Sequence, residues 1–312
     1  MTLNPPAEII KLFKKIIRAF IFKGTLPCIR HNTIIQRKED GGTNLDDIEL
    51  KIKSFRLKYL YKVLESQEEY PLPCYFLSNS LTNIFKQNTY EFYDGELPSF
   101  YESIKDIYLC HSNLFHLSNS VSIYYNLIHM KKQILNDQIK RANEASDLTL
   151  IFKELHGNRY TTPTQKQITY RLLFGITPTS EGLAKRHRRV FFCKFCNIEQ
   201  ETETHIFYSC PSIYTIKLNL IRLLRQPHNT FIDIYEAIFL NITPREENKE
   251  LHLIKHAFLS IYRDTIWIAR NQATHKNYIM SQIQLNTIFH NKVKSFLKRF
   301  KDEESIQYFY LF

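Results

Sequence analysis

The stretch CKFCNIEQETETHIFYSCP, residues 193–211, gathers three cysteines and one histidine. The 312-residue chain has six cysteines, so half of them fall in this short segment. Their spacing is Cys193-x2-Cys196, eight residues, then His205-x4-Cys210. A Cys-x2-Cys turn can present two thiolates to one ion, and a following His and Cys can complete a tetrahedron. The spacing therefore predicts a zinc site with four protein ligands, which leaves no open position for a catalytic water and indicates a structural role.

The alternative is a group of buried cysteines beside a core histidine, since cysteine is often buried without a metal. The residues between the second and third ligands, NIEQETET (197–204), are polar and offer little to form a core of their own. Metal binding could supply this segment with ~10 kcal/mol or more of local folding free energy, as it does in zinc-finger peptides. Cys28, Cys74 and Cys110 are scattered along the chain, and we interpret them as structural thiols.

Composition indicates a folded and mainly helical protein. Hydrophobic residues make up 44% of the chain, with 23 Phe and 19 Tyr, so most of it can contribute to a core. Glycine is scarce, with 7 residues, which disfavours an architecture rich in tight turns. The fold class we predict is mainly α, an extended helical array with a small CCHC zinc knuckle and a few short strands.

Helical periodicity of apolar residues indicates where the helices should lie. We expect Asp46 or Asp47 to cap one of them and Gly175 to end another. A short extended piece is expected at residues 33–36. The expected helices are 7–22, 48–64, 100–109, 120–155 with an interruption at 143–147, 162–175, a short one within 177–190, 212–226, 248–276 and 285–301.

The net charge of +11 favours an anionic partner such as nucleic acid. Two basic runs could follow a phosphate backbone, although basic helix faces that are simply solvated remain the alternative. Their residues are Lys51, Lys53, Arg56, Lys58 and Lys62 in the first run, and Lys185, Arg186, Arg188 and Arg189 in the second. Between the first two cysteines of the cluster, Lys194 and Phe195 could offer a charge and a stacking face to a base, with packing under the turn as the alternative for Phe195.

The first helix is amphipathic and basic, a pattern that occurs both in membrane-surface helices and in ordinary domain helices. We favour a domain helix with a solvated basic face and expect no membrane partner. The first residues lack a basic start followed by an apolar run, and no apolar stretch has the length of a membrane span. These features predict an intracellular protein, nuclear and/or cytoplasmic, in which thiols stay reduced.

Four stretches in the same order resemble the carboxy-terminal region of non-LTR (LINE-type) retrotransposon reverse transcriptases. The cysteine cluster with its upstream helix is the most specific of them, and Arg270–Asn271 in the last stretch is similar to a pair in the family's late helix. The stretches are FIFKGTLPCIRHNTIIQRKEDGGTNLDDIELKIKSFRLKYL (20–60), LPSFYESIKDIYL (97–109), TPTQKQITYRLLFGITPTSEGLAKR (162–186) continuing into the cluster, and TIWIARNQATHK (265–276).

The resemblance implies a zinc-stabilised fragment that grips template RNA and/or target DNA, with a separate polymerase chain as a further candidate partner. The division it implies is a thumb-like segment (1–65), a helical connector (66–180), the CCHC module (181–225) and a carboxy-terminal helical region (226–312). Asp46–Asp47 follows a Gly-Gly turn and lacks the setting of a polymerase palm, and no endonuclease is recognisable. We therefore expect no enzymatic activity. A domesticated structural or protein-interaction module of the same fold is the alternative.

Overall fold

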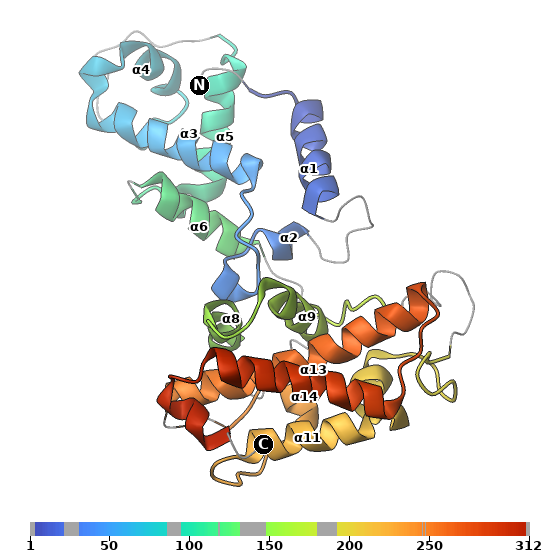
Figure 1. Cartoon of the computed structure of the whole chain (residues 1–312). Helices are drawn as coiled ribbons and strands as arrows, with labels where there is room; N and C mark the ends of the chain where they lie inside the picture. The colour runs from blue at the N-terminus through green and yellow to red at the C-terminus, as the bar shows by residue number, and fades with distance from the viewer. Residues whose placement is uncertain are drawn as a thin grey trace. The chain divides into compact units, whose positions relative to one another are not determined.

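The computed structural model is mainly helical, as the sequence predicts (Figure 1). It describes residues 4–21, 31–85, 95–117, 119–131, 148–179, 192–244, 246 and 248–309. Instead of the few short strands that were expected, these residues contain one isolated β-bridge, between Phe192 and Gln200. The chain forms two compact units, which combine residues 1–37 with 42–133 and residues 38–41 with 134–312. The four-segment division stays a prediction.

Some predicted features lie outside the described residues. Among them are Cys28, the interruption at 143–147 and, apart from the non-helical residues 177–179, the segment 177–190 in which a short helix was expected. The second basic run falls in the same part of the chain, and its members are Lys185, Arg186, Arg188 and Arg189. Their proposed contacts with nucleic acid therefore stay predictions from the sequence.

The first unit is a cluster of helices around one central helix. Its helices are α1 (Ala7–Ile21), α2 (His31–Ile34), α3 (Ile48–Glu65), α4 (Pro71–Leu77), α5 (Ser99–His111) and α6 (Ser120–Met130) (Figure 1). α3 packs against both α5 and α6. The core between them includes Leu57, Leu60 and Ile104, each completely buried. Burial of such aliphatic side chains stabilises the unit by about 1.5–3 kcal/mol each.

The extended conformation expected at residues 33–36 is wrong, because this segment begins inside the single helical turn of α2. Its β-branched residues favour a strand locally, but Thr33 and Ile34 are buried in the unit, and such packing overrides local preference. The Ile34 carbonyl accepts hydrogen bonds from both the backbone N–H and the hydroxyl of Thr43, each at 3.0 Å. The turn is therefore fixed by contacts with residues that follow the Gly-Gly pair.

Asp47, not Asp46, caps α3. Its carboxylate accepts hydrogen bonds from the backbone N–H groups of Glu49 and Leu50 at 2.9 and 3.2 Å. The same carboxylate accepts from His31 at 3.1 Å and from Lys131 at 3.0 Å. Burial alone would raise the pKa of Asp47, but the hydrogen bonds from these two side chains and the charge of Lys131 hold the pKa well below its ordinary value. Asp47 is thus a buried anion that joins three segments of the unit.

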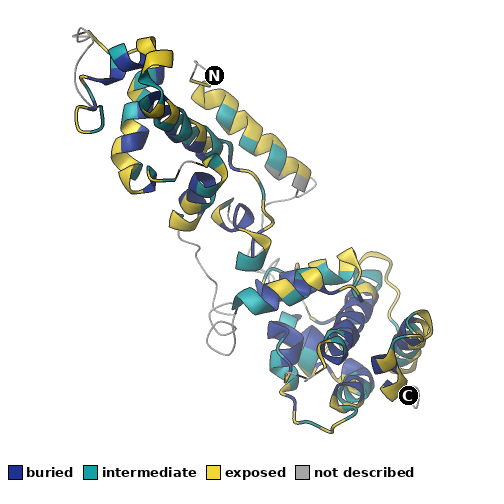
Figure 2. Ribbon diagram, turned by 90° about the vertical axis from the view of Figure 1, so that its left-hand side faces the viewer, coloured by how far each residue is buried: buried dark blue, intermediate teal, exposed yellow. Residues whose placement is uncertain are grey.

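α1 presents most of its apolar side to solvent as well as the solvated basic face that was expected (Figure 2). Lys14 on its basic side pairs with Glu49 of α3 at 2.7 Å. Its exposed apolar side chains are Ile9, Leu12, Phe13, Ile16 and Phe20, with exposed fractions of 43–85%. Among the described residues, no helix is both long and apolar enough to cross a bilayer.

The second unit is built around the 27-residue helix α13 (Lys249–His275). α9, α11 and α14 each pack against it, and most of its side chains are buried (Figures 1 and 2). The other helices are α8 (Leu148–Gly157), α9 (Pro163–Leu173), α11 (Tyr214–Arg225), α12 (Ile234–Leu240) and α14 (Gln282–Arg299). Thr162 caps α9 in a capping box, and Gly175 follows it with φ +59°, as the sequence predicts.

A completely buried arginine joins α13 to the end of α12. Arg263 donates to the carbonyl oxygens of Ala237 and Ile238 at 2.6 and 2.9 Å, and to Thr169 and Asn241 at 3.0 Å. These carbonyls lie in the last turn of α12, where the helix dipole favours a cation. Burial lowers the pKa of Arg263 to about 9, so the guanidinium remains charged at neutral pH. Its charge is therefore matched by helix carbonyls and neutral side chains.

We expect Asp47→Ala to lower the free energy of unfolding by at least about 1–2 kcal/mol, because it removes a helix cap and leaves Lys131 without its anion. Its contribution is fully present above pH 3.8, the ordinary pKa of the carboxyl, and is lost as the pH falls towards the lowered folded value. Urea denaturation followed by circular dichroism measures the change.

Asp46→Ala is the matched control. Asp46 is next in sequence, but its side chain is 60% exposed and pairs with Lys51 on the surface. Its removal should change the free energy of unfolding by less than about 0.5 kcal/mol. Equal losses for the two variants would contradict the role assigned to Asp47.

Candidate metal centre

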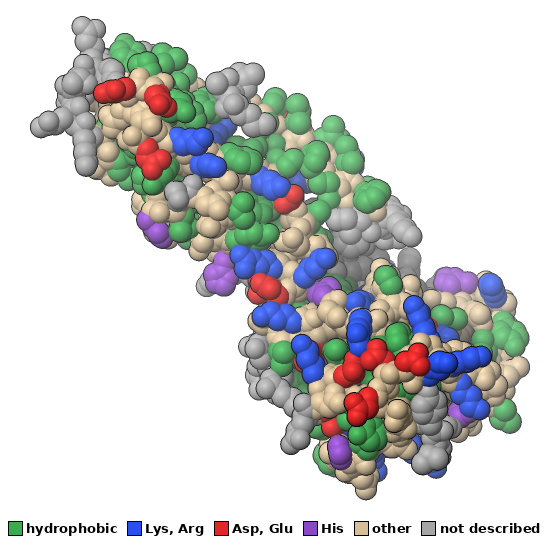
Figure 3. Space-filling view, turned by 60° about the vertical axis from the view of Figure 1, so that its left-hand side comes forward, with side chains coloured by type: hydrophobic (Ala, Val, Ile, Leu, Met, Phe, Trp, Pro, Cys, Tyr) green, Lys and Arg blue, Asp and Glu red, His purple; other side chains and the backbone are tan. Residues whose placement is uncertain are grey.

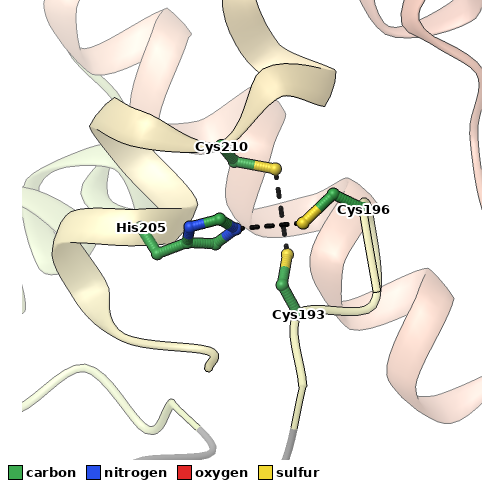
Figure 4. Close-up of side chains that lie close together, drawn as sticks. All are labelled: Cys193, Cys196, His205 and Cys210. Atoms are coloured by element: carbon green, nitrogen blue, oxygen red, sulfur yellow. Dashed lines mark hydrogen bonds between the residues drawn. The ribbon is translucent and has the colours of Figure 1, made fainter. Parts of the chain in front are cut away.

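The four predicted ligands converge in the second unit (Figure 4). Cys193 and Cys196 lie on a turn, His205 begins a short π-helical segment (His205–Ser209), and Cys210 follows that segment directly. Cys193, His205 and Cys210 are almost completely buried, with exposed fractions of 1–2%, and Cys196 is half-buried. The expected grouping is therefore present in the folded chain.

The distances between the ligand atoms fit a tetrahedral metal site. The Sγ atoms of Cys193 and Cys210 are 3.8 Å apart, and Cys196 Sγ lies 3.2 Å from His205 Nε2. One ligand atom from each of the four residues lies within 4.8 Å of all the others. Metal–sulfur bonds of about 2.3 Å in a regular tetrahedron separate two sulfurs by about 3.8 Å. One ion can therefore contact all four side chains with little movement of the protein.

Backbone geometry shapes the Cys-x2-Cys turn for this purpose. The N–H of Phe195 points at the sulfur of Cys193, with N and Sγ 3.4 Å apart, and the Cys193 carbonyl accepts from Asn197 N–H at 2.8 Å. Asn197 has φ +57°, the left-handed conformation that asparagine tolerates better than most residues. Cys193 N–H then donates to Glu199 O at 2.8 Å and closes the loop. N–H groups directed at a sulfur favour its thiolate form, which is the form that binds metal.

Glu199 orients the histidine ligand, a role that the sequence did not reveal. Its carboxylate lies 2.9 Å from His205 Nδ1, which places the ring proton on Nδ1 and leaves the lone pair of Nε2 directed at the sulfurs. A carboxylate behind a ligating histidine is a common second partner in metal sites because it fixes both tautomer and ring orientation. Glu199 was visible only as one acidic residue in a polar loop.

The sulfurs of Cys193 and Cys210 lie within hydrogen-bonding distance of each other, and a proton can be held between them. The hydrogen bond to Cys210, together with burial, raises the pKa of the Cys193 thiol. The same bond lowers the pKa of Cys210. A bound cation would replace this proton, because thiolates are the ligands that metals bind. Metal binding and proton release are therefore coupled at this site.

A buried ion pair fastens the loop of the cluster to α13. Arg270 donates through Nε and Nη2 to one oxygen of Glu201, at 3.1 and 2.6 Å. Both residues are buried, with exposed fractions of 4% and 0%. Ile206 and Phe207 after His205 are also completely buried. The loop thus has more means of fixing itself than its polar sequence suggested, and Arg270 has a structural role.

The other predicted contacts around the cluster differ in accessibility. Lys194 is exposed, whereas Phe195 is half-buried and so partly committed to packing. Two apolar side chains that the sequence reading passed over are more accessible, since Phe192 is 51% and Ile198 68% exposed. Phe192 therefore offers a better stacking face than Phe195.

The first basic run lies on α3 in the other unit and divides between two faces. At about 100° per residue, Lys51, Lys58 and Lys62 fall on one side of the helix, away from its buried side chains. Lys53 and Arg56 fall elsewhere and line a pocket with residues of α5. Arg56 also donates to Ser103 Oγ, which commits it to the fold. Lys58 and Lys62 can therefore act together on an external ligand, and Lys51 can join them by exchanging its partner Asp46 for that ligand.

A second group with metal-binding residue types, Glu154, His252 and His256, is explained by hydrogen bonding. Asn241 accepts from Arg263 through Oδ1, so its Nδ2 donates to His256 Nδ1 at 2.9 Å. His256 Nε2 then donates to Thr243 at 2.9 Å, and His252 Nε2 donates to Glu154 at 3.1 Å. Burial holds the pKa of His256 well below its ordinary value, as does the charge of the neighbouring Arg263. Because Arg263 would repel a dication, we interpret this group as a satisfied polar network.

We expect the purified chain to carry one metal ion, which Cys196→Ser and Cys210→Ser should abolish. A strong chelator should lower the melting temperature of the second unit by more than about 10 °C, because the site contributes folding free energy. Elemental analysis measures metal content, and the fluorescence of Trp267, the single tryptophan, follows unfolding. Cys110→Ser is the control, since Cys110 is exposed and outside the cluster. Full metal content in the Cys196→Ser and Cys210→Ser variants would refute the site.

Arg270→Leu should cost about 3–5 kcal/mol of unfolding free energy, because it leaves the Glu201 carboxylate buried without its partner. The double variant Glu201→Leu/Arg270→Leu should lose less than Arg270→Leu alone. Urea denaturation of the metal-loaded protein gives the three values. Arg159→Leu serves as the comparison. Arg159 is 59% exposed in its pair with Glu250, so this substitution should lower the free energy of unfolding by less than about 1 kcal/mol. Additive losses in the double variant would count against a direct pair.

Comparison with known proteins leaves the cluster to be judged on its own geometry. No protein-family model matches the chain, and no curated protein is significantly similar to it in sequence. What this site can bind therefore has to be inferred from its side chains, their distances and their surroundings.

Proposed function

We propose that this chain is a zinc-stabilised nucleic-acid-binding module similar to the carboxy-terminal region of a LINE-type reverse transcriptase. The observation that carries the proposal is the convergence of Cys193, Cys196, His205 and Cys210 within 4.8 Å of one another. Three thiolates and one imidazole are a common ligand set for structural zinc, which accepts a tetrahedral site without electronic preference. Soft sulfur ligands disfavour magnesium and calcium, which bind oxygen.

The four ligands support a structural metal, and we therefore propose that the chain binds nucleic acid without catalysing a reaction on it. Four protein ligands complete the tetrahedron, so a bound zinc would have no position for a substrate or a reactive water. Of the adjacent aspartates, Asp47 is engaged as a helix cap and Asp46 pairs with Lys51 at 2.5 Å. The proposed role is therefore to grip RNA and/or DNA inside the cell, in the nucleus or the cytoplasm, with any polymerase activity supplied by a separate chain.

The row formed by Lys51, Lys58 and Lys62 on α3 is the proposed phosphate contact. It extends over about 16 Å along the helix, enough to reach several successive phosphates of one strand. On the face drawn in Figure 3, Lys and Arg side chains are interspersed with acidic ones, so total charge by itself does not identify a binding surface. The row is the more specific candidate because its members share one outward side. In the second unit, exposed Lys194 and Phe192 beside the cluster offer a charge and a stacking face of their own.

We expect the chain to bind labelled single-stranded RNA and duplex DNA with an affinity that falls steeply as salt increases. The variant Lys58→Gln/Lys62→Gln should weaken binding about tenfold at low salt. It should also reduce the slope of log K against log [salt] by about 1.4–1.8, because two phosphate contacts are lost. Fluorescence anisotropy at several salt concentrations measures both quantities.

The matched control is Lys249→Gln/Lys276→Gln, which removes the same charge from exposed positions at the two ends of α13. This control should leave both affinity and slope close to those of the unmodified chain. Weak binding without salt dependence in the unmodified chain would overturn the proposed function. Equal effects of the two double variants would reject the α3 row and leave a nonspecific charge effect.

A structural or protein-interaction module of the same fold is the second candidate, and one observation favours it. The exposed apolar face of α1, which includes Ile16 at 57% and Phe20 at 85%, suits an apolar surface of another protein. A separate polymerase chain is one partner that such a face could contact. Failure to bind nucleic acid, together with a stable complex abolished by Ile16→Ser/Phe20→Ser, would favour this candidate.

A further inference from the structure

An open pocket of about 620 Å³ lies in the second unit, away from the cysteine cluster in sequence. It is formed at the carboxyl end of α11, where α14 packs alongside (Figure 1). None of the described residues that line it carries a carboxylate. They are Asn219, Arg222, Arg225, Gln226, Pro227, Asn229 and His290. Two guanidinium groups, one imidazole and several amides thus surround a space large enough for a small polar ligand.

The two arginines are suited to an anion. Both Arg222 and Arg225 are exposed, and each guanidinium carries five N–H donors in a planar fork. Arg222 uses one nitrogen in a long contact of 3.4 Å with Asn219 Oδ1, which retains donors for a ligand. Asn219 is itself held by Asn286 at 2.8 Å. Because the last carbonyls of α11 carry partial negative charge, the side chains and not the backbone must supply the attraction.

Gln226 adds a second kind of recognition. Its Oε1 atom is buried and, among the described residues, has no hydrogen-bond partner. Gln226 lines the pocket, so a small rotation of its side chain would expose this acceptor to a ligand that donates a hydrogen bond. A bare inorganic anion at neutral pH has few donors, whereas a sugar hydroxyl or a base N–H can donate. The pocket therefore combines an anion site with a neighbouring acceptor.

We propose that this pocket binds the phosphate of a nucleotide unit, with Arg222 and Arg225 on the phosphate oxygens and Gln226 accepting from the sugar or base. Forked guanidinium groups match phosphate geometry and form strong, charge-assisted hydrogen bonds with it. The ligand could be one unit of a nucleic-acid strand or a free nucleotide. In the first case the pocket deepens the proposed function and rests on it, while in the second it stands independently.

Pyrophosphate and adenosine diphosphate are the probes for the pocket itself. At a concentration about ten times the dissociation constant, either should raise the melting temperature of the unmodified chain by about 3 °C. Adenosine diphosphate should bind more tightly because it also offers donors to Gln226. The variant Arg222→Gln/Arg225→Gln should lose both shifts, while Lys249→Gln/Lys276→Gln should keep them. Arg222→Lys/Arg225→Lys, which preserves charge, should retain only part of each shift if the planar fork matters.

Two results would overturn the proposal that this pocket binds phosphate. One is the absence of any shift in the unmodified chain, and the other is an equal shift in Arg222→Gln/Arg225→Gln. Circular dichroism establishes that each variant is folded before it is compared, and the lysine variant provides a second test if the glutamine variant is unstable. Both arginines are exposed, so their replacement should leave the core intact.

A single-stranded oligonucleotide distinguishes the two sources of the phosphate. If Arg222→Gln/Arg225→Gln weakens oligonucleotide binding about tenfold beyond the control, the ligand is part of a strand. If this variant no longer binds adenosine diphosphate but still binds the oligonucleotide, the pocket holds a free nucleotide and the strand binds elsewhere. If the unmodified chain binds adenosine diphosphate but no oligonucleotide, the pocket is upheld while the proposed function fails.

Discussion

The contact between Glu201 and Arg270 determines how the cysteine cluster is attached to the rest of the second unit. The two partners lie 69 positions apart in sequence, and both are buried. A charge in such surroundings is tolerated only with its counter-ion, so the loop between Cys196 and His205 has one acceptable position against α13. Tyr262, also on α13, donates to the carbonyl of Phe207 at 2.8 Å and fixes the segment after His205. The ligands are thus held from both sides of the histidine by one helix.

The spacing of the ligands was sufficient to predict the grouping, because a Cys-x2-Cys turn and a nearby His and Cys have few ways to fold except around a common point. The residues that support the ligands were not predictable in the same way. Glu199 contributes a carboxylate whose role depends on ring orientation, and a single sequence contains no periodicity for that. The pairing of Glu201 with Arg270 joins two of the stretches that carried the family resemblance. The presence of both stretches in one sequence was the signal that could have suggested this ion pair.

Helices were predicted well where apolar periodicity and a capping residue agreed, as for α9 and α13. Periodicity identifies an apolar face but not what covers it, and for this reason the sequence could not show that much of the apolar face of α1 is exposed. The β-branched segment at 33–36 failed for the opposite reason, since burial of Thr33 and Ile34 outweighed local preference. All five basic residues of α3 were predicted equally as phosphate contacts. Packing separates Lys53 and Arg56, which line a pocket, from the others.

The hydrogen-bond chain that begins at Arg263 has a direction. Since the Asn241 carbonyl is taken by Arg263, its amino group must face His256, and every later donor in the chain follows from that orientation. An extra proton on His256 would sit on Nδ1 and face the amino group of Asn241, so that two donors would point at each other beside the charged guanidinium of Arg263. Below about pH 6.5, the ordinary pKa of histidine, the unfolded chain takes up that proton more readily than the folded one. Acid also weakens the binding of metals to thiolates, because protons compete for the sulfur. Acidification would therefore destabilise the second unit at His256, and protons would compete for the sulfurs of the cluster as well.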